Sequence, residues 1–154
     1  MSKTITLYSH SERETQEIGK KIAHMARKGD CFALYGTLGM GKSVLARAFV
    51  QELLSTTDEV PSPTFTLVQM YDADDFTIYH FDLYRLKSPE EIFELGMEEA
   101  LYEGVSLIEW PEKMGGYLPK KAICIQISSE KDSRKIEITT SSEEGMKRIA
   151  ESFL

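Results

Sequence analysis

The sequence predicts an α/β fold: a central sheet, mostly parallel with an antiparallel portion, that is flanked by helices. Short apolar runs of strand length alternate with longer segments in which apolar residues have helical spacing. The runs 31–35 and 105–109 are apolar almost throughout, which is typical of parallel strands covered on both faces. Polar turns separate two further pairs of runs, which indicates antiparallel hairpins.

The first half of the chain is predicted to hold two strands and two helices. A strand from Thr4 over the residues TITLY precedes a helix over 11–29. Ser11 and Glu14 have the spacing of a capping box, and Gly29 is the predicted helix end. The strand 31–35 leads through a glycine-rich loop into a helix with one apolar face, after which prolines exclude further helix. That face comprises Leu45, Ala48, Phe49 and Leu53, and the prolines are Pro61 and Pro63.

In the second half, a hairpin is predicted to join 65–71 and 76–84 across the polar residues 72–75. One continuous helix is expected over 88–101, because Ser88, Pro89 and Glu91 form a capping box with proline at the first helical position. The strand 105–109 follows. Strands 122–128 and 135–139 then flank a polar turn at 130–133, before a capped helix over 141–154.

Length and composition fit one globular domain, which we expect to span residues 1–154. A chain of 154 residues with 42% hydrophobic and 28% charged residues has the usual mixture for a protein that buries its own core. Its net charge of −7 disfavours broad direct binding of nucleic acid, because an acidic surface repels a phosphate backbone.

Cysteine usage and hydropathy indicate a reducing compartment. Cys31 and Cys124 lie far apart inside apolar runs and lack a metal-ligand spacing, so we interpret them as buried hydrophobic residues. The chain opens without the pattern of a secretory signal, and its apolar runs stay well below the roughly 18 residues that a membrane span requires. We therefore expect a cytoplasmic protein that does not associate with membranes.

The loop GTLGMGKS matches the P-loop, or Walker A, pattern and lies between a predicted strand and a predicted helix. Glycines allow its backbone N–H groups to approach phosphate oxygens, and the following helix adds free N–H donors and a positive dipole end. Lys42 is predicted to reach the β and γ phosphates, and the Ser43 hydroxyl to bind Mg²⁺. The predicted phosphate cradle comprises Gly36, Thr37, Leu38, Gly39, Met40, Gly41, Lys42 and Ser43.

A nucleotide site also needs a carboxylate at the end of a neighbouring strand. Asp82 and Glu109 each end an apolar run. We favour Glu109 as the metal partner, because the strand before it is of the apolar kind that lies centrally beside a P-loop strand. Which of the two carboxylates positions the attacking water stays open.

Four segments occur in an order that resembles the TsaE family, also called YjeE: GTLGMGKS, then SPTF at 62–65, HFDLYRL at 80–86 and EWPE at 109–112. The resemblance extends from about Thr15 to Pro119. It implies a P-loop NTPase-like fold and an ATPase that uses ATP and Mg²⁺. It also implies an accessory role in bacterial tRNA threonylcarbamoyladenosine modification, in which the chain sustains transferase turnover with TsaD and TsaB and meets tRNA only through that complex.

The resemblance also implies roles for single residues. Lys42, Asp82, Glu109 and the switch-like Thr64 become catalytic candidates, and Ser43 with Glu109 becomes the metal pair. Thr15, Trp110 and Arg134 become nucleotide contacts. From the residues alone, Thr64 is equally a hydroxyl that caps a turn, and Trp110 equally a core anchor.

The P-loop departs from the usual family sequence GDLGAGKT at Thr37 and Ser43. Serine is chemically equivalent to threonine as a magnesium ligand. The aspartate replaced by Thr37 is a charge beside the phosphates, so its loss is expected to change the hydrolysis rate or the metal dependence.

Other function classes remain as alternatives. A small-molecule kinase of P-loop type is the second interpretation. It is less favoured, because the arginines of this chain are scattered along the sequence and form no arginine-rich lid. A GTPase is disfavoured, because no NKxD-like segment occurs. A nucleotide-dependent switch with negligible turnover overlaps the family reading, since P-loop domains without an arginine finger hydrolyse slowly until a partner supplies charge.

Overall fold

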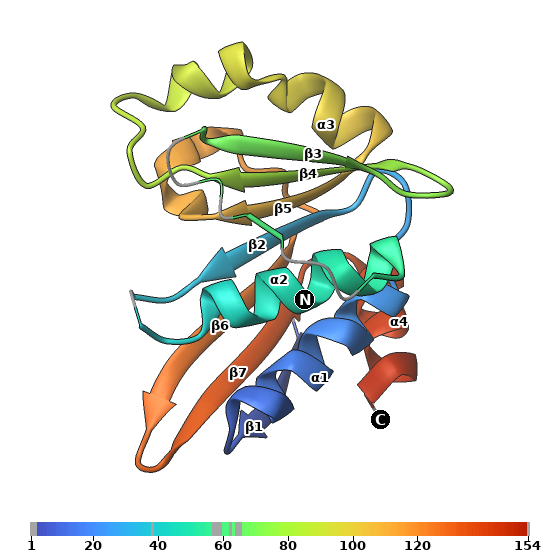
Figure 1. Cartoon of the computed structure of the whole chain (residues 1–154), viewed down its shortest axis with the longest axis vertical. Coiled ribbons are helices and arrows are strands. Elements are labelled where there is room, and N and C mark those ends of the chain that lie inside the picture. Colours follow the sequence, from blue (N-terminus) through green and yellow to red (C-terminus); the bar gives the residue numbers. More distant parts are fainter. Residues whose placement is uncertain (1–2, 38, 57–59, 62, 64–65, 154) are drawn as a thin grey trace.

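The computed structural model describes residues 3–37, 39–56, 60–61, 63 and 66–153 (Figure 1). Seven strands of this part of the chain form one sheet in the order β1-β7-β6-β2-β5-β4-β3. Their bounds are β1 Lys3–Ser9, β2 Cys31–Tyr35, β3 Val68–Asp72, β4 Thr77–Asp82, β5 Val105–Glu109, β6 Ile123–Glu130 and β7 Ser133–Thr140. The predicted strands, including both hairpins, are therefore confirmed.

The sheet is parallel in its middle and antiparallel at both edges, as the predicted fold class requires. The strands β6, β2, β5 and β4 run parallel to one another. The strand β3 pairs antiparallel with β4 at one edge, while β7 and β1 extend the other edge antiparallel. Consequently β2, which precedes the glycine loop, lies directly beside β5, the strand that ends at Glu109.

Helices cover both faces of the sheet. The helices α1 (Glu12–His24), α2 (Lys42–Leu54) and α4 (Glu143–Phe153) pack against one face, where Phe32, Leu34 and Leu107 belong to the core. The 3₁₀ helices η1 (Pro89–Leu95) and η2 (Pro111–Tyr117), with α3 (Met97–Glu103), cover the other face in Figure 1. Because successive strand residues point to opposite faces, a strand covered twice must be apolar throughout, which explains the run CFALY.

The first helix is shorter than predicted. It ends at His24, and Gly29 instead lies in a turn where its N–H donates to the Gly104 carbonyl oxygen at 2.7 Å. The Ser11 hydroxyl accepts from the Glu14 N–H at 3.1 Å as expected, but the Glu14 carboxylate accepts from His10 rather than from Ser11. The prediction of a helix end at Gly29 was wrong, because the last turn already closes at Met25, whose N–H donates to the carbonyl oxygens of Ile22 and Ala23.

The single helix predicted over 88–101 is also wrong. Ser88 and Glu91 do form the capping box, but Gly96 adopts a left-handed conformation with φ of 81° and separates η1 from α3. Glycine enters this conformation without the steric penalty of other residues, so it ends a helix even where the flanking residues have helical spacing.

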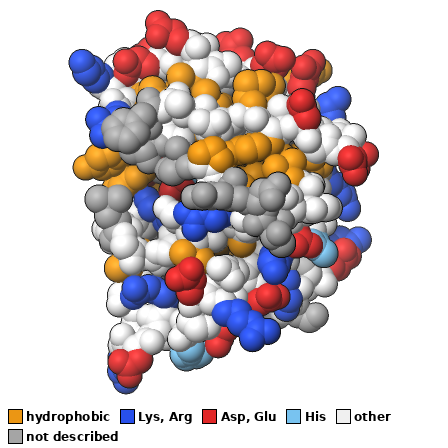
Figure 2. All heavy atoms as spheres, in the orientation of Figure 1, with side chains coloured by type: hydrophobic (Ala, Val, Ile, Leu, Met, Phe, Trp, Pro, Cys, Tyr) orange, Lys and Arg blue, Asp and Glu red, His pale blue; other side chains and the backbone are white. Residues whose placement is uncertain are grey.

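Charged side chains lie on the surface of the molecule (Figure 2), and the described helices are short. In the face shown in Figure 2, acidic side chains gather along the upper rim, where Figure 1 shows η1 and α3, while acidic and basic side chains are mixed over the rest of the face. Among the helices that the structure describes, none is both long and apolar enough to cross a membrane.

Candidate nucleotide site

The glycine loop connects the end of β2 to the first residue of α2, Lys42. At Gly36 the backbone has φ of 147°, and a Cβ atom there would lie 2.8 Å from the Ile127 carbonyl oxygen of β6. Only glycine fits this approach, so the loop can turn tightly over the sheet edge. Leu38, one of the predicted cradle residues, lies outside the described residues.

A cavity of about 430 Å³ opens between this loop and the ends of β4 and β5. The carboxyl ends of parallel strands meet at one sheet edge, and the β4–β5 register places Asp82 opposite Glu109. Both predicted carboxylates therefore face the loop that carries Lys42. The lining residues are Thr37, Gly39, Gly41, Lys42, Ser43, Val44, Asp82, Tyr84, Arg85, Glu109 and Trp110.

Lys42 is a buried cation in this cavity. Lys42 is only 5% exposed, and no described residue forms a hydrogen bond with its Nζ. Burial lowers the pKa of Lys42 below its ordinary value, while the charges of Glu109, Glu112 and Asp82 oppose this shift. A buried ammonium with unused donors is a ready partner for an anion, because charge-assisted hydrogen bonds are the strong ones.

Trp110 provides the contact that Lys42 has in place of a hydrogen bond. The Lys42 Nζ lies 3.8 Å from the centroid of the indole ring, which is a cation–π geometry. The same ring packs on Tyr84 with centroids 4.9 Å apart. Trp110 has φ of 59°, a conformation that costs a bulky residue about 1–3 kcal/mol and that clusters at functional sites.

The two carboxylates are held differently. Glu109 and Asp82 are 5% and 7% exposed. The Glu109 Oε2 lies 2.7 Å from the His80 Nε2, while the Asp82 Oδ1 accepts from the Tyr84 N–H at 3.0 Å. Each carboxylate is thus oriented by a bond from β4 or from the residues that follow it.

The donors around this cavity fit a magnesium ion that is bound jointly with phosphates. The Ser43 hydroxyl and the Glu109 carboxylate offer hard oxygen atoms, the kind that magnesium prefers. The described residues form no cluster of three or more acidic, histidine or cysteine side chains that would cage a metal alone. Magnesium commonly takes one or two protein ligands together with water and phosphate oxygens, so this sparse set suits it.

A second cavity, of about 370 Å³, lies on the other side of the loop and shares Gly39, Gly41 and Val44 with the first. It is lined by the start of α1 and the β6–β7 turn, and it brings Thr15 and Arg134 together from distant parts of the chain. The Arg134 Nη2 donates to the Gly39 carbonyl oxygen at 3.4 Å. Thr15 is buried, and its hydroxyl lies 2.7 Å from that of Ser9.

The predicted site residues that the structure describes therefore gather around the loop, and all of them except Gly36 line one cavity or the other. Thr64 lies outside the described residues. Sequence reasoning missed His80, Tyr84 and Arg85, although all three belong to the quoted segment HFDLYRL. Strand alternation from Asp82 places His80 on the same face, and this signal was available in the sequence.

Comparisons with known proteins find a matching family, sequence relatives and a solved structure. The model of the family TsaE, described as threonylcarbamoyl adenosine biosynthesis protein TsaE, matches residues 9–136. A protein of that name from Rickettsia conorii is 41% identical over 127 residues, covering 82% of this chain and 73% of its own. The Haemophilus influenzae protein of the same name is 36% identical, covering 97% of this chain and 98% of its own. The crystal structure of Bacillus subtilis YdiB superposes with a TM-score of 0.79 at 28% identity, covering 99% and 95% of the two chains.

Proposed function

Because this chain belongs to the TsaE family of threonylcarbamoyl adenosine biosynthesis proteins, a family of P-loop nucleotide-binding proteins, we propose that it binds and hydrolyses ATP in tRNA modification. The observation that carries the proposal is the buried Lys42 ammonium, which no described residue hydrogen-bonds. It lies at the loop in one cavity with Asp82 and Glu109. We treat residues 1–154 as one ATPase domain, whose two core clusters share the same sheet.

The two cavities suit the two ends of ATP. The phosphates would lie in the cavity of Lys42, where loop N–H groups and the ammonium offer donors. The base and ribose would lie across the loop in the cavity lined by Thr15 and Arg134. Met40 lines only this second cavity, whereas Thr37 and Ser43 line only the first, so the loop would follow the nucleotide from base to γ phosphate.

Hydrolysis transfers the γ phosphoryl group of ATP to water and yields ADP and phosphate. Ser43 and Glu109 would hold Mg²⁺, which neutralises charge between the β and γ phosphates when it is bound. The Asp82 carboxylate would accept a hydrogen bond from the attacking water and so orient it. Lys42 and Arg85, both on this cavity, would supply positive charge to the phosphate oxygens.

The partners follow from the family. We propose that the chain acts with TsaD and TsaB, and that it meets tRNA only through them. Its net charge of −7 supports this indirect role, because the surface offers little general attraction for a phosphate backbone. A cytoplasmic location would suit such partners. We expect slow hydrolysis by the chain alone and faster hydrolysis in the complex.

The decisive experiment measures phosphate release from Mg·ATP by the purified chain, alone and with its cognate TsaD and TsaB. Stimulation by the pair, lost in Glu109→Ala but retained in Asp75→Ala, is the expected result. Asp75 is a matched control, because it is an exposed carboxylate in the β3–β4 turn. Equal rates with and without the pair would refute the partner role.

A small-molecule kinase is the second candidate, and the position of Arg85 on the phosphate cavity favours it more than the sequence did. The kinase hypothesis would be supported if ATP consumption required an added small-molecule acceptor and did not change when TsaD and TsaB were added.

A further inference from the structure

His80 lies on β4 two residues before Asp82, so both side chains point to the sheet face that α2 covers. Its Nε2 lies 2.7 Å from the Glu109 Oε2, and the two side chains are 4% and 7% exposed. The other ring nitrogen, Nδ1, has no hydrogen-bond partner among the described residues. Among the residues that the structure describes, the ring therefore hydrogen-bonds Glu109 alone.

The direction of this bond follows from the chemistry of the acceptor. An ionised carboxylate can only accept, so the His80 Nε2 carries the hydrogen and donates it to Oε2. That bond fixes one oxygen of Glu109 and leaves Oε1 without a bond to the ring. Glu109 also lines the cavity of Lys42 and Ser43, so its second oxygen is the one available to a ligand there.

We propose that His80 is a positioning residue that orients the Glu109 carboxylate for a divalent cation bound with the nucleotide. This inference rests on the proposed function, because it concerns the same metal pair, Ser43 and Glu109. Hydrogen-bond partners of metal-binding side chains fix their orientation, and loss of such a partner typically weakens metal binding by about 10–100-fold. His80 does not touch the cation itself.

The chain contains a matched control for this pair. His24 of α1 also bonds a glutamate, Glu52 of α2, through its Nε2. There the histidine side chain is 67% exposed, and neither residue lines the nucleotide cavities. A His24→Leu variant therefore removes a histidine–glutamate pair without disturbing the proposed metal ligand.

The test measures ADP binding by calorimetry while Mg²⁺ is varied, and again with EDTA. His80→Leu removes the donor, whereas His80→Gln retains an N–H at similar reach. For His80→Leu we expect the Mg²⁺ concentration that produces half of the full change in ADP affinity to rise by about 10–100-fold. We expect unchanged ADP affinity in EDTA, a near-normal Mg²⁺ requirement in His80→Gln, and a normal one in His24→Leu.

An unchanged Mg²⁺ requirement in His80→Leu would overturn the inference, as would a defect in His80→Gln equal to that in His80→Leu. Thermal melting without nucleotide checks folding, and His80→Asn, whose amide is too short to reach Glu109, replaces the leucine variant if that variant does not fold. A wild-type chain whose ADP binding ignores Mg²⁺ would refute the proposed metal site together with this inference. If ADP binding by the wild type depends on Mg²⁺ and His80→Leu shows the same dependence, only the inference about His80 is refuted.

Discussion

Substitution of Lys42 by methionine separates what this residue does for folding from what it does for nucleotide binding. Methionine keeps most of the apolar stem and removes the ammonium. In the nucleotide-free protein, a buried donor without a partner costs about 1–3 kcal/mol. The contact with the Trp110 ring at 3.8 Å returns about 0.5–2 kcal/mol. The pKa of Lys42 is lowered by burial even though Glu109, Glu112 and Asp82 attract the ammonium, so the charge is unfavourable on balance. The difference between the midpoints of the two ranges then predicts that Lys42→Met is more stable than the wild type by about 1 kcal/mol.

The effect on nucleotide binding has the opposite sign. A hydrogen bond between charged groups contributes about 1.5–3 kcal/mol, and the Lys42 ammonium would make such a bond with phosphate. Its loss corresponds to ADP affinity weaker by roughly 10–150-fold. The variant should therefore melt higher than the wild type without ligand and gain less from added ADP.

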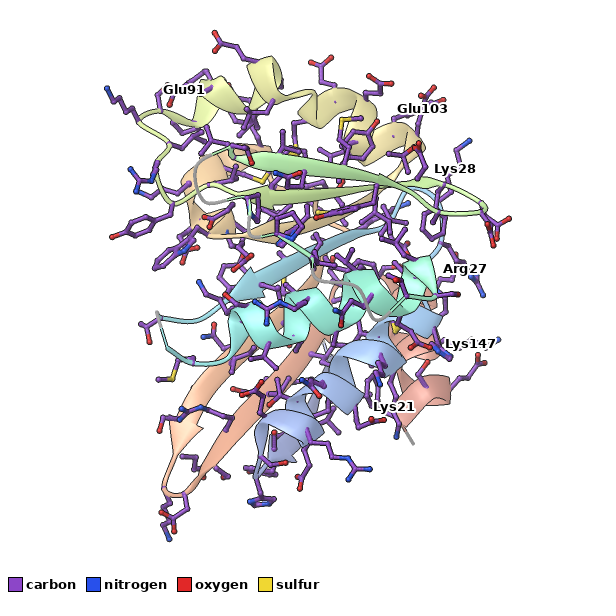
Figure 3. The ribbon with its side chains drawn as sticks, viewed as in Figure 1. Lys21, Arg27, Lys28, Glu91, Glu103 and Lys147 are labelled. Carbon is purple, nitrogen blue, oxygen red and sulfur yellow. The ribbon has the colours of Figure 1, made fainter. Side chains whose placement is uncertain are left out.

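Differential scanning calorimetry over a series of ADP concentrations measures both effects. For a chain of this length a change of 1 kcal/mol shifts Tm by about 2–4 °C. The control is Lys21→Met, since Lys21 also lies over an aromatic ring, Phe153, at 5.9 Å, but it is exposed on α1 far from the loop (Figure 3). A lower Tm of nucleotide-free Lys42→Met, or unchanged ADP affinity, would refute the reasoning.

Three further outcomes follow from single residues. Thr37→Asp restores the usual family carboxylate on the wall of the phosphate cavity, so phosphate release measured across Mg²⁺ concentrations should rise; an identical profile would mean that this position does not affect turnover. Gly19→Ala should lower the free energy of unfolding in urea by about 1–3 kcal/mol, because its Cβ would lie 2.7 Å from the Leu45 carbonyl oxygen; Gly116→Ala, with open space around its Cβ, should not. Burial raises the pKa of Cys31 to about 12, so iodoacetamide should label this thiol only after denaturation, and fast labelling of the native protein would contradict its burial.

Local sequence patterns predicted those parts of the fold that depend on nearby residues. The runs 31–35 and 105–109 are apolar because helices cover both faces of their strands, and this pattern placed them correctly in the sheet interior. The errors at Gly29 and Gly96 have another cause. The first helix closes its last turn at Met25, well before Gly29, and at Gly96 a left-handed conformation interrupts helical spacing on both sides.

The same distinction applies to the site. The glycine loop, Asp82 and Glu109 could be predicted because each lies at a recognisable strand end or loop. The contact of His80 with Glu109 depends on the register between β4 and β5, which the sequence of either strand alone does not contain. Arg134 reaches Gly39 only because β6 lies beside β2, so its place near the loop rested on the resemblance until the sheet order was known.

The two sides of the phosphate cavity differ in what holds them before nucleotide binds. On the carboxylate side, Glu109 and Asp82 already have hydrogen-bond donors, so folding alone orients them. On the loop side, the Lys42 ammonium lies over the face of Trp110 and has no hydrogen bond from the described residues. Buried polar groups in folded proteins nearly always have partners, so the unpaired ammonium on the wall of this cavity is consistent with the proposed phosphate contact. It follows that substitutions on the carboxylate side should reduce both stability and metal binding, whereas removal of the Lys42 ammonium should reduce only nucleotide binding.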